Sequence, residues 1–350
     1  MNFNNVLKNK SPYLIAEIGV NHEGSIAKAK KMINLAKRAG ANCVKFQTYK
    51  AEKLASIKSP YYWDIKKEKT RTQFELFKKF DTFNTKQYRI LYDYCSKLKI
   101  DFLTTPFDID AVDDIDDFVK FHKISSSDLN NFPLIEKICS KNKTILISTG
   151  ASTYQEIKKT VNFINKINSK LKIVLLHCVL SYPTKNSDAN LNFITLLKRK
   201  FPQCIVGYSD HTLPSPNMDN LLFSYILGAQ IIEKHFTLDK TKKGNDHYHS
   251  MDYIDIKNFI RSIKNYNSII GEKSKFRNVL ECEKVSRINA RRNIYTNSNL
   301  KKGSIIKSED IICKRPAIGG LDPIYFKKII GKKMLRNLKK DVVIKLKDFR

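Results

Sequence analysis

The chain has 350 residues but lacks long hydrophobic runs, closely spaced cysteine pairs and glycine-rich stretches. No apolar run approaches the roughly 18 residues of a membrane span, so we expect no membrane-spanning helix and no membrane partner. The N-terminal segment Met1–Val6 lacks the basic and then apolar order of a signal peptide. The seven cysteines form no CxxC pair and several lie inside apolar runs, which is typical of free thiols in a reducing compartment. We therefore expect a cytoplasmic protein.

Acidic residues are also scarce relative to basic ones, with 34 Asp and Glu against 64 Lys and Arg and a formal net charge of +30. A strongly basic protein can bind nucleic acid. The lysines are spread over the whole chain, however, and no recognised nucleic-acid motif accompanies them. We therefore expect no nucleic-acid partner, and we expect the basic field to attract phosphorylated and carboxylated substrates.

From Tyr13 to about Ile270, short apolar runs alternate with amphipathic segments. The apolar runs are Tyr13–Gly19, Cys43–Gln47, Phe102–Thr105, Phe121–Ser125, Thr144–Ser148, Ile173–His177, Cys204–Ser209 and Gln230–His235. Helical patterns between them include Ile26–Ala39, Thr85–Leu98, Thr153–Ile167 and Ala189–Lys200. Eight strands, each followed by a helix, indicate an α/β fold of the (β/α)8 TIM-barrel type. An open doubly wound sheet is the alternative, but it would favour a glycine-rich phosphate loop, and the sequence has none.

A polar linker at 273–284 separates the predicted barrel domain, residues 1–272, from a small β-rich domain, residues 285–350. The small domain contains an internal repeat, because Leu300–Lys307 is echoed by Leu338–Lys345. Each copy is typical of a turn followed by a short strand. Within the barrel domain, the long loop Glu52–Phe80 either covers the site or is an excursion with its own helix at Thr72–Lys79.

Polar residues follow the apolar runs at the strand ends, where the active sites of TIM barrels lie. Lys45, Lys123 and Lys234 stand within the strands, and helix capping does not explain them. We expect all three to point into the barrel mouth, toward a phosphate or carboxylate. His211 and His235 follow the seventh and eighth runs, where two imidazoles can share one divalent metal ion. Taken alone, they could equally be two unrelated histidines.

An ordered set of motifs resembles the N-acetylneuraminate (sialic acid) synthase family. The motifs are Ala16–Gly24, Val44–Thr48, Thr105–Phe107, Ser148–Gly150, Tyr208–Thr212 and Glu233–Thr237. Lys314–Pro316 and its flanking repeats look like the antifreeze-like (SAF) domain that ends these enzymes. The resemblance implies a TIM barrel followed by a SAF domain in a domain-swapped homodimer. It also implies condensation of phosphoenolpyruvate with an N-acylated hexosamine, which yields a sialic-type (nonulosonic) acid and phosphate.

The same resemblance implies roles for individual residues, carried over by position. His211 and His235 would be the ligands of a divalent metal ion, Mn²⁺ or Mg²⁺. The phosphoenolpyruvate contacts would be Lys45, Thr105, Lys123, Ser126, Ser148 and Ser209. The sugar-binding set would be Gln47, Tyr182, Asp128 and Arg315, with Arg315 reaching the site of the partner chain. Glu17 and Asp246 match the sugar side as well, and either could be the general base.

The sequence departs from the family pattern at two places. Leu180 stands where some members carry asparagine, and Asn245–His249 differs from the usual Pro-Asp-His segment. The acceptor could therefore be N-acetylmannosamine or a 2,4-diacetamido-trideoxyhexose, the latter leading to legionaminic or pseudaminic acid. A 3-deoxy-octulosonate synthase is disfavoured because those enzymes are essentially barrels alone. A non-catalytic protein that binds anionic glycans is disfavoured by the strand lysines.

Overall fold

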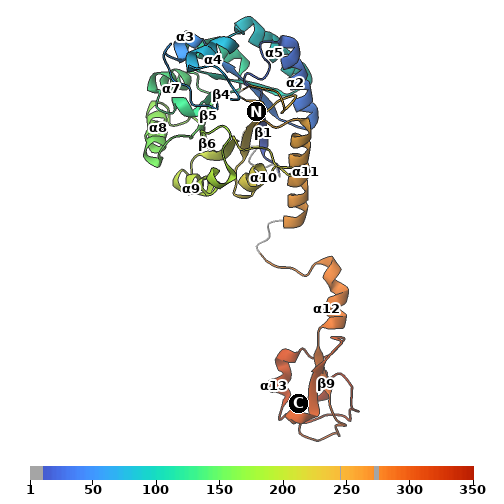
Figure 1. Cartoon of the computed structure of the whole chain (residues 1–350). Coiled ribbons are helices and arrows are strands. Elements are labelled where there is room, and N and C mark those ends of the chain that lie inside the picture. Colours follow the sequence, from blue (N-terminus) through green and yellow to red (C-terminus); the bar gives the residue numbers. More distant parts are fainter. Residues whose placement is uncertain (1–10, 245, 272–275) are drawn as a thin grey trace. The chain divides into compact units, whose positions relative to one another are not determined.

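The computed structural model describes residues 11–244, 246–271 and 276–350. Its contacts divide the chain into two compact units, Met1–Gly271 and Glu272–Arg350 (Figure 1). The first three residues of the predicted linker, 273–275, and Asn245 lie outside the described residues. Each unit is described by itself below.

The first unit is built around a parallel eight-stranded sheet. Its strands are β1 (Tyr13–Glu17), β2 (Cys43–Thr48), β3 (Asp101–Pro106), β4 (Phe121–Ile124), β5 (Thr144–Ser148), β6 (Ile173–Cys178), β7 (Ile205–Asp210) and β8 (Ile231–His235). The strands follow the order β3-β2-β1-β8-β7-β6-β5-β4, and the two end strands β3 and β4 lie in contact. The predicted TIM barrel is confirmed.

Helices surround the strands of this unit (Figure 1). They are α2 (Ile26–Ala39), α3 (Ala51–Leu54), α4 (Gln73–Phe80), α5 (Thr85–Leu98), α6 (Ile109–Ile115), α7 (Phe132–Cys139), α8 (Tyr154–Ile167), α9 (Asn192–Lys200), α10 (Asp219–Ile226) and α11 (Tyr253–Ile270). Among the described residues, no helix combines the length and apolar character that crossing a membrane requires.

Helix α2 illustrates how local sequence determines these elements. The Ser25 hydroxyl accepts a hydrogen bond from the backbone N–H of Lys28 and caps the helix start. Met32 and Ile33 are fully buried on the face turned to the strands, where each contributes roughly 1.5–3 kcal/mol of apolar burial. Gly40 ends the helix at φ 111°, a conformation that favours glycine, and an added Cβ would lie 2.3 Å from Cδ1 of Ile260.

The register of the parallel strands decides which side chains share the barrel interior. Glu17 on β1 is level with Lys45 on β2 and with His235 on β8. Residues level with each other in a parallel ladder point to the same face, and successive residues of a strand alternate between faces. Polar side chains at the carboxyl ends of β1, β2 and β8 therefore meet inside the barrel.

The second unit contains α12 (Lys284–Ala290), β9 (Asn293–Thr296), β10 (Ile311–Lys314) and α13 (Phe326–Ile329), with β9 and β10 antiparallel. The two copies of the internal repeat pair with each other, because Leu300 and Leu338 exchange both backbone hydrogen bonds at 2.8 Å. The prediction of a short strand in each copy is wrong. Each copy instead has a turn between two isolated β-bridges, and a 3-10 turn follows it, at Ser308–Asp310 and at Leu346–Asp348. Ile306 and Ile344 are buried in the unit's apolar core.

Candidate active site

Four buried charged side chains from four strands meet inside the barrel near the strand ends. They are Glu17, Lys45, Lys123 and Glu233, which we call the lysine–carboxylate cluster. The Lys45 Nζ atom lies 2.7 Å from Oε2 of Glu17 and 3.8 Å from Oε2 of Glu233. The Lys123 Nζ atom lies 3.8 Å from Oε1 of Glu233. Each charge in the cluster therefore faces at least one charge of opposite sign.

Hydroxyl groups add hydrogen bonds to this cluster. Lys45 donates to Thr105 Oγ1 at 3.1 Å, and Lys123 donates to Ser148 Oγ at 2.7 Å. Ser209 Oγ donates to Oε1 of Glu233 at 3.0 Å. Ser126 lies in the loop after β4, where its Oγ accepts from the Gly150 N–H at 3.0 Å. Ammonium and hydroxyl donors gathered in this way can hold a phosphate or a carboxylate.

The Glu17 carboxyl is poised to exchange a proton near neutral pH. Burial raises its pKa to about 7, although the Lys45 ammonium opposes that rise and the Glu233 carboxylate adds to it. Nε2 of Gln47 donates to the other Glu17 oxygen, Oε1, at 3.1 Å, which orients the carboxyl. Burial likewise lowers the pKa of Lys123. Groups with shifts of this kind are typical of sites that move protons.

Three histidines and one aspartate form a second group next to the first. His211, His235, His249 and Asp246 are buried, and we call them the histidine cluster. The ring centroids of His235 and His249 lie 4.9 Å apart, and those of His211 and His235 lie 5.5 Å apart. Nδ1 of His235 lies 3.6 Å from Oδ2 of Asp246. The ring of Tyr182 packs on His211 with centroids 4.3 Å apart.

The chemistry of the histidine cluster fits a divalent metal ion. One ligand atom each of His235, Asp246 and His249 lies within 4.8 Å of the others. Nδ1 of His211 donates to the Val179 carbonyl at 2.8 Å, so its Nε2 is left as the electron-pair donor. Burial holds the pKa of His235 well below its usual value, with His249 and His211 adding to the effect. A neutral imidazole is the form that binds metal.

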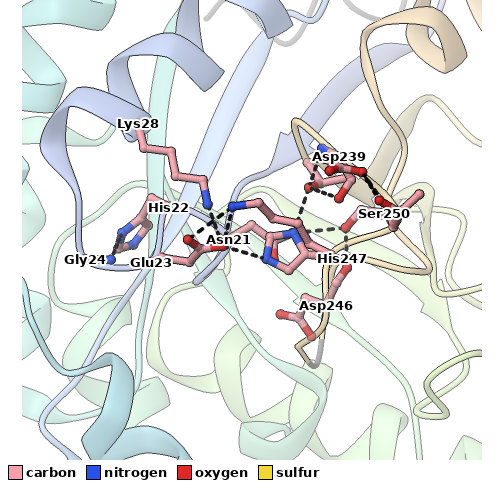
Figure 2. Close-up of polar contacts among 12 residues, drawn as sticks. Asn21, His22, Glu23, Gly24, Lys28, Asp239, Asp246, His247 and Ser250 are labelled. Atoms are coloured by element: carbon pink, nitrogen blue, oxygen red, sulfur yellow. Dashed lines mark hydrogen bonds and ion pairs between the residues drawn. The ribbon is translucent and has the colours of Figure 1, made fainter. Parts of the chain in front are cut away.

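The loop that carries Asp246 and His249 is anchored to the loop after β1 (Figure 2). Nε2 of His247 donates to Oε1 of Glu23 at 3.2 Å, and its Nδ1 lies 2.8 Å from the Thr237 hydroxyl. Ser250 Oγ donates to the Asp246 carbonyl and accepts from the Asn21 amide, at 2.5 and 3.1 Å. These bonds fix the loop's path, so the Asp246 carboxyl is held against the cluster.

The long loop before α4 contacts the loop that carries Asp246 and His249. The Lys67 Nζ atom lies 3.5 Å from the ring centroid of Tyr248, and the Tyr248 hydroxyl donates to the Tyr182 carbonyl at 2.7 Å. The predicted helix of this loop is present as α4, which begins after the capping residue Thr72. The loop therefore combines both predicted features, an excursion with its own helix and a cover over part of the site.

Of the predicted sugar-binding residues, Asp128 is bonded within its own loop and Arg315 belongs to the second unit. The Asp128 carboxylate is buried among its own neighbours, accepting from Ser125 Oγ at 2.6 Å and from Asn131 Nδ2 at 3.1 Å. Arg315 belongs to the second unit, where it is exposed in the segment after β10. The other two, Gln47 and Tyr182, contact Glu17 and His211 respectively.

The expectation that Lys234 points into the barrel mouth is wrong. Its ammonium donates to Oδ2 of Asp210 at 2.5 Å and to the Thr212 carbonyl at 2.7 Å, and the side chain is fully buried away from the site. The reason is the twofold alternation of a strand. Glu233 and His235 face inward, so the residue between them faces outward. The same alternation, applied to the sequence, would have identified Glu233, which sequence reasoning missed.

His249 was also missed as a candidate ligand. In the sequence, it appears only as part of an unusual segment after Gly244. The signal that identifies it is structural: it is fully buried beside His235 and Asp246. Burial raises the pKa of that Asp246 carboxyl to about 6, against the lowering effects of His211 and Lys45.

Comparison with known proteins follows the same division into units. A family model described as the NeuB family matches residues 32–275, and a SAF domain model matches residues 291–350. An N,N'-diacetyllegionaminic acid synthase of Campylobacter jejuni is 34% identical over 96% of this chain and 99% of its own length. An N-acetylneuraminate-9-phosphate synthase of Drosophila melanogaster is 33% identical over 97% of both chains. The crystal structure of a sialic acid synthetase from Leptospira borgpetersenii, in complex with citrate, superposes with a TM-score of 0.69 at 31% identity, over 79% of this chain and 90% of that one.

Proposed function

The chain belongs to the NeuB family, and we propose that it condenses phosphoenolpyruvate with an N-acylated hexosamine to give a nonulosonic acid and phosphate. It is an enzyme of the nonulosonate synthase kind, a transferase that forms a C–C bond. The observation that carries the proposal is the position of the lysine–carboxylate cluster beside the histidine cluster in one barrel mouth. Glu17 belongs to the first cluster and is level in the strand register with His235 of the second.

Phosphoenolpyruvate would be bound by the lysine–carboxylate cluster. Lys45 and Lys123 would pair with its phosphate and carboxylate, assisted by the hydroxyls of Thr105, Ser126, Ser148 and Ser209. The two lysines are already desolvated and hydrogen-bonded, so little reorganisation accompanies binding. A substrate fixed in this way is held in reach of an aldehyde bound at the histidine cluster.

The histidine cluster would hold the divalent metal ion, which we propose to be Mn²⁺ or another divalent ion rather than a monovalent one. His211 and His235 would be ligands, and Asp246 supplies a carboxylate within 3.6 Å of His235. When bound, the ion supplies electrophilic polarisation of the aldehyde oxygen. The orphaned Nδ1 of His235, which lacks a hydrogen-bond partner within the described residues, supports this assignment.

Proton transfer in the reaction is assigned to Glu17. The C3 carbon of phosphoenolpyruvate forms the new bond to the aldehyde carbon, water adds at C2, and phosphate leaves to give the 2-keto acid. Both protons of the water are released, one as it adds at C2 and the other when the C2 hydroxyl becomes the ketone. One of them reaches the aldehyde oxygen and the other leaves with the phosphate. A carboxyl whose pKa is about 7 can accept the first proton and pass it to the aldehyde oxygen near neutral pH. Asp246, whose pKa burial raises to about 6, would lie at the metal ion beside His235.

The acceptor sugar would lie against Gln47 and Tyr182, with Asp128 at the edge of the site. Arg315 would reach the same site in a partner chain of a domain-swapped homodimer, which would explain its exposure in the second unit. Both N-acetylmannosamine and a 2,4-diacetamido-trideoxyhexose are candidates.

The decisive experiment measures phosphate release on incubation with phosphoenolpyruvate, Mn²⁺ and a panel of N-acylated hexosamines. We expect release with at least one member of the panel, and mass spectrometry of the product then identifies the acceptor. Absence of phosphate release across the whole panel, in a preparation that binds Mn²⁺, would overturn the proposal in favour of a protein that only binds anionic glycans.

A further inference from the structure

The imidazole of His249 has no partner for either ring nitrogen within the part of the chain that the structure describes, although its side chain is fully buried. The other buried histidines outside the two clusters differ from it. His247 has both nitrogens engaged, with Thr237 and Glu23. His122 and His177 each keep one nitrogen bonded, to Asp116 and to the Ala189 carbonyl. Buried polar groups are almost always paired, so a doubly unpaired ring indicates a missing partner.

The position of His249 indicates what that partner is. Its ring lies 4.9 Å from the His235 ring, and one of its nitrogens lies within 4.8 Å of ligand atoms on His235 and Asp246. The Nδ1 atom of His235 also lacks a hydrogen-bond partner among the described residues. Two unpaired imidazoles and a carboxylate aimed at one point form a donor set for a metal ion.

The alternative, that His249 is a protonated ring held by Asp246, is not supported by its contacts. Such a ring would donate a hydrogen bond to the carboxylate, and neither nitrogen of His249 has a hydrogen-bond partner among the described residues. The anchored loop also presents the ring in a fixed position, because His247 and Ser250 on either side are bonded to the barrel.

We propose that His249 is a metal ligand of this chain, acting with His235 and Asp246, and that this donor set selects a first-row transition ion over Mg²⁺. Imidazole nitrogen suits ions such as Mn²⁺, Fe²⁺, Co²⁺ and Zn²⁺, whereas Mg²⁺ prefers a shell of oxygens. Two imidazoles and one carboxylate leave open positions on the ion, and His211 lies close enough to contribute a further nitrogen, with its ring 5.5 Å from that of His235. The inference rests on the proposed function for the role of the ion, but not for its binding.

The test measures Co²⁺ binding by calorimetry and by visible absorption, on chelator-treated protein without either substrate. The wild type, His249→Ala and His249→Phe are compared, with His122→Asn as the control because that histidine is buried but lies outside both clusters. We expect both His249 variants to bind Co²⁺ at least about tenfold more weakly with an altered absorption spectrum, and His122→Asn to bind as the wild type does. Millimolar Mg²⁺ should not displace the Co²⁺.

The phenylalanine variant shows whether weaker Co²⁺ binding results from loss of the ligand or from loss of the fold. It fills the same space without a polar group, so its melting temperature without metal should equal or exceed that of the wild type, while the rise on adding Co²⁺ is lost. Wild-type Co²⁺ affinity and spectrum in both variants, or ready displacement by Mg²⁺, would overturn the inference. The binding test needs no substrate, so it is independent of the condensation assay. If Co²⁺ binding depends on His249 but the protein shows no condensation activity, this inference holds and the proposed function fails.

Discussion

The two clusters in the barrel mouth satisfy their buried polar groups in opposite ways. In the lysine–carboxylate cluster, each charge faces an opposite charge within 3.8 Å, and hydroxyls take up further hydrogen bonds. In the histidine cluster, His249 and Nδ1 of His235 have no hydrogen-bond partner among the described residues. Oε2 of Glu17 and Oε2 of Glu233 also lack a hydrogen-bond partner there, but each lies within 3.8 Å of a lysine ammonium. The first cluster is therefore balanced in charge, whereas both nitrogens of His249 carry a desolvation cost that a ligand would remove.

Substitutions in the two clusters should therefore have different effects, on the stability of the fold in the first cluster and on ligand binding and catalysis in the second. Removal of one member of a balanced buried ion network leaves its partners uncompensated, which destabilises the fold. Removal of an unpaired group relieves a desolvation cost and removes only what the group does for a ligand. The following predictions test this division, from the largest expected effect to the smallest.

We expect His235→Ala to lower kcat/KM for the condensation by about 10³-fold, roughly 4 kcal/mol of transition-state stabilisation. The protein without metal should still fold, with a melting temperature within about 5 °C of the wild type, because the lost ring nitrogen had no partner. Steady-state kinetics and thermal melts measure the two effects. Unfolding of this variant would mean that the histidine cluster is structural, and the comparison would fail. His211→Ala should lower kcat/KM similarly, but it should also lower stability somewhat, because it removes the hydrogen bond from His211 Nδ1 to the Val179 carbonyl.

We expect Glu233→Ala to lower the free energy of unfolding by about 3 kcal/mol, since Lys45 and Lys123 lose a shared counter-charge in the barrel interior. Urea titration measures the change. Inorganic phosphate should stabilise this variant more than the wild type, because the anion replaces the missing carboxylate. The matched control is Glu52→Ala, which removes an exposed carboxylate paired with Lys78 and should change stability far less than Glu233→Ala does. Similar losses in both variants would remove the distinction between a buried network and a surface pair.

The pH dependence of stability sharpens the comparison within the first cluster. Glu17 has a pKa of about 7 when folded, against an ordinary value of 4.5, so the folded chain keeps a proton that the unfolded chain releases. Its contribution to stability is fully present below pH 4.5 and is lost as the pH rises to about 7. Glu17→Gln should therefore gain stability relative to the wild type by roughly 2 kcal/mol between pH 5 and pH 8. Urea titrations at the two pH values measure it, and the exposed Glu281→Gln should show no such trend.

The smallest effect concerns a residue that belongs to neither cluster. Arg315→Ala should raise the KM for the acceptor sugar about tenfold, roughly 1.4 kcal/mol, and leave the KM for phosphoenolpyruvate nearly unchanged. The physical reason is that the lysine–carboxylate cluster binds its anion without help from the second unit. Kinetics with each substrate varied in turn provide the test, and Arg292→Ala in the same unit is the control. Equal weakening toward both substrates would contradict a sugar-specific role in a domain-swapped dimer.

Much of the barrel could be predicted because its signals are local. The bounds of α2 and α5 match the predicted segments, since capping residues mark the ends: Ser25 and Asn84 at the starts, and left-handed residues Gly40 and Lys99 just beyond. The strand β5 likewise has its predicted bounds. The sequence signals of an apolar strand and of a capped amphipathic helix each lie within a short stretch of the chain, so they can be recognised without knowledge of the tertiary contacts.

The errors arise where the outcome depends on more than one local pattern. The sequence predicts that Lys234 faces the site because it is a charged residue in an apolar strand. In the structure its neighbour Glu233 faces the barrel interior and contacts Lys45, whereas Lys234 pairs with Asp210. The two copies of the internal repeat in the second unit look like short strands in the sequence, yet they form only isolated β-bridges while Ile306 and Ile344 pack into a shared core. The unpaired state of His249 depends on a loop packing onto distant strands, and loop residues follow no period that would reveal it.

The anchoring of the loop after β8 has an evolutionary consequence. The bonds that hold its path belong to His247 and Ser250, whereas the groups that face the site belong to Asp246 and His249. If His249 binds the ion as proposed, a substitution at position 249 would alter ion preference while the bonds of His247 and Ser250 keep the backbone in place. Ion selectivity could then diverge within the family through a single codon.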